Sequence, residues 1–157
     1  MRDGRIGRGH QACLLPNAGH LSYPEPLFAV PDTQMNRNIL DAARIHPAVR
    51  DKIAASHADV VQEVQAAIAA NAIVVVGMAQ NPHPRRARKA LDAAGLPYKY
   101  LGYGSYLGGW RRRNALKMWT GWPTFPMIFV KGVFVGGAAD LQRLIDSGEL
   151  GRLLAAP

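Results

Sequence analysis

The chain has 157 residues, a length that suits one domain able to bury a core without disulfide bonds. Hydrophobic residues make up 48% and charged residues 19% of the chain, and no uninterrupted apolar run is long enough to cross a bilayer. The single cysteine, Cys13, excludes an intramolecular disulfide and a multi-cysteine metal site within one chain, and it agrees with a reducing compartment. We therefore expect a cytoplasmic protein without a membrane partner.

The positive charge is unevenly distributed along the sequence. The formal net charge is +8, and residues 1–34 contribute nothing to it because their three arginines are balanced by three carboxylates. All of the surplus belongs to residues 35–157. Such a surplus attracts anions, from small carboxylates and phosphates to nucleic acid, but it does not specify which.

The N-terminal third of the chain divides into two parts. Residues 1–34 are rich in Gly, Pro, His and polar residues without periodicity, which predicts a disordered tail. Residues 35–57 are expected to form a helical extension, with Pro47 at the first helical position and Val49, Ile53 and Ala54 on one stripe. Residues 58–157 are then expected to form the main domain.

The main domain begins with a second helix and a buried strand. Valines and other apolar residues recur at helical spacing after residue 59, and Asn71 is expected to end this helix in the left-handed conformation. The run Ala72–Gly77 is a continuous β-branched segment, typical of a central strand covered on both faces. After a turn at Asn81–Pro84, a helix follows that is closed by Gly95.

The C-terminal part alternates strands and helices. A strand is predicted over Pro97–Tyr103, and a helix over Leu107–Trp119. In this helix Leu107, Trp110, Asn114 and Met118 form the expected buried face, and Arg111, Arg112, Arg113 and Lys117 the exposed one. A hairpin turning at Gly132 joins Thr124–Lys131 to Val133–Val135, and one final helix runs from about Ala138 to Leu154.

Three segments resemble glutaredoxins, most closely the monothiol type. They are Arg113–Pro126, which contains Trp122-Pro-Thr-Phe-Pro126, then Phe134–Gly137, and Ser147–Leu150. The resemblance extends from about Asp59 to Leu154. Together with the element order, it implies an α/β protein of thioredoxin-like (glutaredoxin) fold, with a four-stranded mixed sheet flanked by helices.

The resemblance also implies a glutathione-binding groove. In that family the proline matching Pro126 is cis, and the main chain at Phe125 would pair with the cysteinyl part of glutathione. The expected residues for glutathione or another anion are Asn81, Arg113, Lys117, Thr124, Phe125, Pro126, Gly136 and Gly137. The acidic residue that normally meets the γ-glutamyl amine falls on Ala139, and one helical step is expected to rotate Asp140 away from the groove.

The reactive cysteine of the family is replaced in this chain. Its position falls on Asn81, a favoured N-cap followed by Pro82, and the second active-site position is Pro84. An amide cannot form a mixed disulfide with glutathione, so no catalytic residue is assigned. Nor can it replace a thiolate on an iron–sulfur cluster, and a lone His83 is a poor substitute, so neither a cluster nor another metal is expected.

Three interpretations follow. The first is a non-catalytic glutaredoxin-like module that binds glutathione, another small anion or a protein partner in the inherited groove. The second is a glutathione-dependent thiol-disulfide oxidoreductase, or an iron–sulfur-related monothiol glutaredoxin, that uses a thiol from elsewhere, such as Cys13 or a partner's cysteine. The third is a nucleic-acid-binding protein that uses the basic runs Arg85–Lys89 and Arg111–Arg113, although no recognised motif accompanies these charges. The sequence leaves open the physiological ligand, the oligomeric state and the role of residues 1–34.

Overall fold

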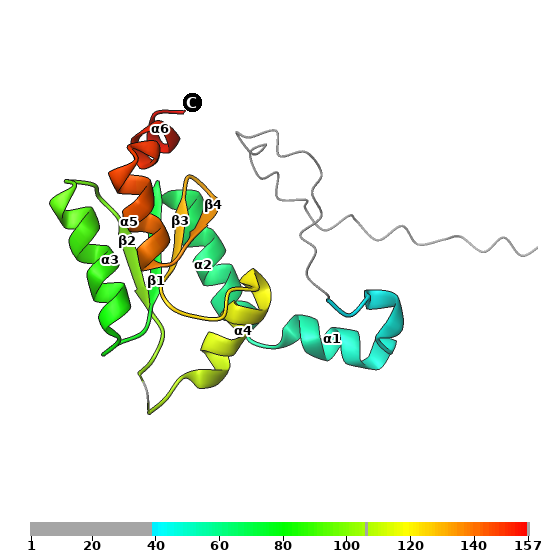
Figure 1. Cartoon of the computed structure of the whole chain (residues 1–157). Coiled ribbons are helices and arrows are strands. Elements are labelled where there is room, and N and C mark those ends of the chain that lie inside the picture. Colours follow the sequence, from blue (N-terminus) through cyan, green and yellow to red (C-terminus); the bar gives the residue numbers. More distant parts are fainter. Residues whose placement is uncertain (1–38, 106, 157) are drawn as a thin grey trace, which may run out of the picture.

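A computed structural model describes residues 39–105 and 107–156 of the chain (Figure 1). The predicted tail and Cys13 therefore lie outside the described residues. The elements in chain order are η1 (Ala42–Arg44), α1 (Pro47–Ala55), α2 (Ala58–Ala70), β1 (Ile73–Gly77), α3 (Pro82–Ala93), β2 (Lys99–Gly102), α4 (Trp110–Thr120), β3 (Met127–Val130), β4 (Val133–Gly136), α5 (Ala138–Asp146) and α6 (Glu149–Ala155). No helix among the described residues is both long and apolar enough to traverse a bilayer.

The four strands form one mixed sheet in the order β2-β1-β3-β4. Strand β1 pairs parallel with β2 and antiparallel with β3, and β3 and β4 form the predicted hairpin. All five residues of β1 are buried, as expected for a β-branched run that is covered on both faces. The thioredoxin-like fold with a four-stranded mixed sheet is confirmed.

Helices cover both faces of the sheet and create two separate cores (Figure 1). On one face Val60 and Val64 of α2 and Leu116 of α4 pack on β1 and β3, and all three are fully buried. On the other face α3, α5 and α6 supply Leu91, Leu141 and Leu150. Because β1 and β3 contribute alternate side chains to each core, the hairpin and β1 are held from both sides.

The predicted buried face of α4 is wrong, whereas Arg111 and Arg112 are exposed as predicted. Trp110 and Met118, expected to be buried, are 59% and 67% exposed, whereas Arg113, expected to be exposed, is only 9% exposed. The helix begins at Trp110, after Gly109 in the left-handed conformation, so Leu107 lies in the preceding loop. Leu116 fixes the orientation of α4 because it is the aliphatic residue of the helix that enters the core.

Two predicted helix boundaries also differ from the structure. The final helix is two helices, since Gly148 adopts a left-handed φ of 72° between α5 and α6. Asn71 is extended rather than left-handed, and its side-chain amide donates a hydrogen bond to the Ala67 carbonyl at 2.8 Å. His57, between α1 and α2, takes the left-handed conformation instead.

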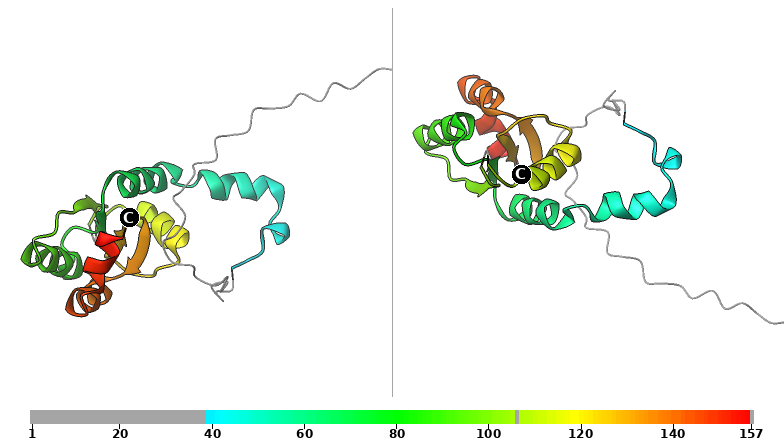
Figure 2. Two further views of the ribbon diagram at one scale, coloured as in Figure 1. Left: turned by 90° about the horizontal axis from the view of Figure 1, so that it is seen from above. Right: turned by 90° about the horizontal axis from the view of Figure 1, so that it is seen from below.

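Helix α1 projects from the layered domain (Figure 2). Its N-cap is His46, whose Nδ1 accepts the Ala48 N–H at 3.2 Å, and Pro47 occupies the predicted first position. The predicted stripe of Val49 and Ile53 is 45% and 47% exposed, and α1 contains no buried residue. The stripe therefore does not enter either core.

Candidate functional site

Asn81 is the N-cap of α3 and lies in the loop that follows β1. Its backbone is extended (φ −86°, ψ 126°), and its Oδ1 accepts the His83 N–H at 3.0 Å. Pro82 occupies the first helical turn, where its missing N–H costs no hydrogen bond. The half-buried side chain of Asn81 is thus a helix cap, as its sequence position predicts.

Backbone hydrogen bonds join the loop before Asn81 to the residues that follow β2. The Tyr103 N–H donates to the Gly77 carbonyl at 3.0 Å, and the Ala79 N–H donates to the Gly104 carbonyl at 2.9 Å. Pro84 is buried, and a Cβ on Gly77 would lie 2.9 Å from the Pro84 Cβ. The second active-site position is therefore a packing contact against β1, and Gly77 allows that close approach.

The Phe125–Pro126 segment enters the sheet at the same end. The peptide bond between these residues is cis, both side chains are buried, and Thr124 before them is exposed. Val76 pairs with Met127 across the antiparallel β1–β3 ladder. The residues just after β1 and just before β3 therefore meet at one edge, which brings Asn81 and Phe125–Pro126 to the same end of the sheet.

Gly136 and Gly137 complete this end of the sheet from β4. Gly136 has a φ of 101°, and a Cβ on Gly137 would lie 3.7 Å from the Pro126 carbonyl oxygen. The Asp140 carboxylate is engaged at the start of its own helix, because its Oδ2 accepts the Gly137 N–H at 2.8 Å. This hydrogen bond and an ion pair with Arg143 hold the pKa of Asp140 below its usual range.

The two predicted cations of α4 differ in their surroundings. Lys117 is half-buried, with its Nζ 5.9 Å from the centre of the Phe125 ring. Arg113 instead points into the loop after β2, where its Nη1 donates to the carbonyls of Tyr103 at 3.2 Å and Gly108 at 2.5 Å. The structure thus brings the predicted residues to one end of the sheet, with one exception. The Arg113 guanidinium is turned to the protein's own backbone, to which its Nη1 donates.

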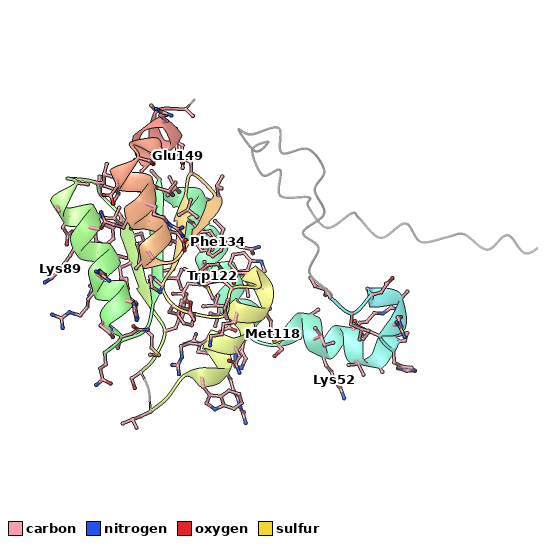
Figure 3. All side chains as sticks on the ribbon, viewed as in Figure 1. Lys52, Lys89, Met118, Trp122, Phe134 and Glu149 are labelled. Carbon is pink, nitrogen blue, oxygen red and sulfur yellow. The ribbon has the colours of Figure 1, made fainter. Side chains whose placement is uncertain are left out.

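Several residues that sequence reasoning missed support this region. Trp122 packs edge-on against Phe134 of β4 with ring centres 5.5 Å apart, and Figure 3 labels the two residues next to each other. Gly104 lets Arg113 approach, since a Cβ there would lie 2.9 Å from Nη1. In the sequence, the glycines at 104, 108 and 109 were the sign that another group, here the Arg113 guanidinium, approaches this loop closely.

Tyr103 lies in the core beside these residues. Its hydroxyl is buried and has no hydrogen-bond partner among the described residues, although the Glu63 carboxylate is close enough to act on it. Burial first, and then Glu63, raise the pKa of Tyr103 far above its ordinary value. The phenol therefore stays neutral at physiological pH and serves the core rather than acid–base chemistry.

The described residues offer little for a metal. Among residues 39–105 and 107–156 no group of three His, Cys, Asp or Glu side chains is arranged to hold an ion. His83 is exposed at the start of α3. Of the basic run on α3, Arg85, Arg86 and Lys89 are exposed, and the Arg88 guanidinium stacks 4.5 Å over the ring of Tyr100.

Comparison with known proteins agrees with this architecture. The family model described as Glutaredoxin matches residues 73–135. A "Glutaredoxin-like protein" of Dictyostelium discoideum is 46% identical over 94 residues, which cover 60% of this chain and 76% of that protein. Mitochondrial glutaredoxin-2 of Rattus norvegicus is 33% identical over 90 residues, 57% of each chain.

Solved structures give the same result. A buckwheat glutaredoxin–glutathione complex matches with a TM-score of 0.57 at 25% identity, over 63% of this chain and 90% of that one. Oxidised glutaredoxin 2 from Chlamydomonas reinhardtii matches with a TM-score of 0.55 at 29% identity, over 63% of this chain and 94% of that one. The chain belongs to the glutaredoxin family.

Proposed function

We propose that this protein is a non-catalytic member of its family that binds reduced glutathione or a similar small peptide anion. The observation that carries the proposal is Asn81, which occupies the nucleophile position as a helix cap, with its Oδ1 on the His83 N–H. An amide at this place cannot attack a disulfide, because exchange requires a thiolate. Pro84 likewise offers no second thiol.

The preserved main chain supports binding without catalysis. The cis bond before Pro126 and the adjoining Gly136–Gly137 pair lie at one end of the sheet, next to the start of α3. An extended peptide pairs with exposed main-chain groups rather than with particular side chains, so this surface can outlast the loss of the cysteine. A family member from buckwheat has been solved as a glutathione complex.

The charge near the groove favours an anion. Lys117 lies beside Phe125, the Arg113 guanidinium is engaged elsewhere, and the domain as a whole is basic. We therefore propose that the ammonium group of Lys117 binds a carboxylate of the ligand. Its removal is expected to weaken glutathione binding about tenfold, the equivalent of about 1.4 kcal/mol.

Calorimetry with reduced glutathione tests the binding. Lys117→Met is the test variant, and Lys89→Met is the matched control because Lys89 projects from the outer side of α3, away from the sheet (Figure 3). Binding that falls in Lys117→Met and not in Lys89→Met supports the proposal. Absence of binding at millimolar glutathione would contradict it.

A hydroxyethyl disulfide assay with glutathione tests the missing chemistry. The natural chain should show no turnover, Asn81→Cys should gain it, and Asn81→Ser should not, because serine keeps the cap without supplying a thiol. Cys13→Ser is made in each background. Turnover by the natural chain that Cys13→Ser abolishes would favour the second interpretation, a working oxidoreductase with a borrowed thiol.

A further inference from the structure

A second hollow lies away from the sheet end described above. The α1–α4 groove, as we name it, has a volume of about 700 Å³ between α1, α2 and α4. Its walls include Ile53, Val61, Trp110, Met118 and Trp119. None of the residues assigned to glutathione lines it, so its occupant is a separate question.

The groove presents large apolar side chains to solvent. Trp110 is 59% and Met118 67% exposed, and Figure 3 shows Met118 on the side of α4 that faces α1. Trp119 and Ile53 are also exposed, and Ile39 and Leu40 add to the apolar surface just ahead of α1. Large exposed apolar patches of this kind mark places where another chain segment packs.

The charge of the groove restricts what fits. Arg111 is the one fully charged residue among those that line it, and it stacks 5.5 Å from the ring of Trp110. No carboxylate belongs to the lining. A segment that combines apolar side chains with negative charge is therefore complementary, and aromatic-lined grooves suit proline-rich segments in particular.

One part of this chain has that composition. The segment Tyr23–Asp32 reads Tyr-Pro-Glu-Pro-Leu-Phe-Ala-Val-Pro-Asp. It has three prolines, the apolar residues Leu27, Phe28 and Val30, and two carboxylates. Between residues 9 and 36 the chain contains no lysine or arginine, so the segment is negative where the remainder of the protein is basic.

The segment is close enough along the chain to reach the groove. Phe28 precedes Ile39, the first described residue, by eleven positions. An extended chain of that length spans up to about 36–40 Å. Helix α1 has nine residues, which is a length of about 14 Å. The connection can therefore double back along α1 to its C-terminal end, where Ile53 borders the groove.

We propose that Tyr23–Asp32 docks in the α1–α4 groove of its own chain, as an extended polyproline-type segment. Leu27 and Phe28 cover Trp110 and Met118, and the carboxylates face Arg111. The prolines reduce the conformational entropy lost on docking. Because both partners belong to one chain, the contact forms at an effective concentration that does not depend on dilution.

Millisecond hydrogen–deuterium exchange on the full chain tests this contact. The amides of residues 27–30 should exchange about tenfold more slowly than unprotected amides of the same sequence. Met118→Asp should remove the protection, and Lys89→Asp, an exposed change on α3, should leave it intact. Trp110→Ser serves as a second groove variant should Met118→Asp lower the melting temperature.

Any outcome other than protection that the groove variants remove overturns the proposal. Protection that is absent, or that survives both groove variants, would mean that the segment does not occupy the groove. Protection that disappears on dilution would mean that the segment of a second copy binds instead. Protection that is lost in the groove variants and independent of concentration is the result expected.

Discussion

Replacing Arg113 by alanine should destabilise the domain strongly. Its Nη1 donates to two carbonyls, those of Tyr103 at 3.2 Å and Gly108 at 2.5 Å, and the residue is 9% exposed. Both carbonyls belong to the loop between β2 and α4, so Arg113 ties this loop to the helix that follows it. The variant removes that connection and leaves the three strand pairings of the sheet in place.

The magnitude follows from the two acceptors. Hydrogen bonds from a charged donor contribute about 1.5–3 kcal/mol each, which gives about 3–6 kcal/mol for the pair. Gly108 is exposed, so water can satisfy its carbonyl in the variant, whereas Tyr103 is buried and leaves its carbonyl without a partner. The expected loss of unfolding free energy is therefore about 2–4 kcal/mol, a fall in melting temperature of about 10–20 °C.

Arg112→Ala is the matched control on the same helix. Arg112 is exposed, and its ion pair with Asp59 at 3.4 Å joins two side chains that are each at least half exposed. Such surface pairs contribute about 0–1 kcal/mol. Urea unfolding of both variants gives the comparison. Equal losses in Arg113→Ala and Arg112→Ala, or a weakening of glutathione binding by Arg113→Ala without loss of stability, would refute the structural role of Arg113.

Variants at three further positions probe the sheet end and the core. Asn81→Ala should lose about 1 kcal/mol of unfolding free energy because the His83 N–H loses its cap, and Asn81→Ser should lose less by urea unfolding. Asp140→Ala should cost about 1 kcal/mol at pH 7. Because the folded pKa of Asp140 is lowered from its ordinary value of 3.8, its contribution is complete above that value and disappears as pH falls through the folded pKa, so the difference in stability between the two proteins should begin to shrink below about pH 4. Leu116→Ala should cost about 2–5 kcal/mol in the same assay, since Leu116 is fully buried between α4 and the sheet; a loss below 1 kcal/mol would contradict that packing.

Local sequence signals predicted much of the fold because the backbone preferences of individual residues determine where these helices and strands begin and end. The β-branched run of β1, the proline at the start of α1 and the Gly95 after α3 each act through their own backbone preferences. The position of Asn81 as a cap follows from the same kind of signal. These features need no knowledge of distant contacts.

The predictions were wrong where contacts between residues far apart in the sequence determine the structure. Helix α4 has large apolar side chains at Trp110 and Met118 and a single buried leucine, so its periodicity does not identify the core face. Arg113 is buried because backbone carbonyls from a separate loop satisfy its guanidinium, which no pattern within the helix reveals. The juxtaposition of Pro126 with Gly137 depends on strand register, and the sequence predicted it only through the family resemblance.

The two helices that begin at this end of the sheet now differ in charge. The first turn of α5 is already neutralised, since the Asp140 carboxylate binds the Gly137 N–H and pairs with Arg143. Asn81 caps α3 with a neutral amide, whereas a reactive cysteine would place a thiolate there. The partial positive charge of α3 is therefore left without a compensating negative group from Asn81. Under the proposed function, α3 rather than α5 is therefore the helix from which an anion beside Phe125 gains most.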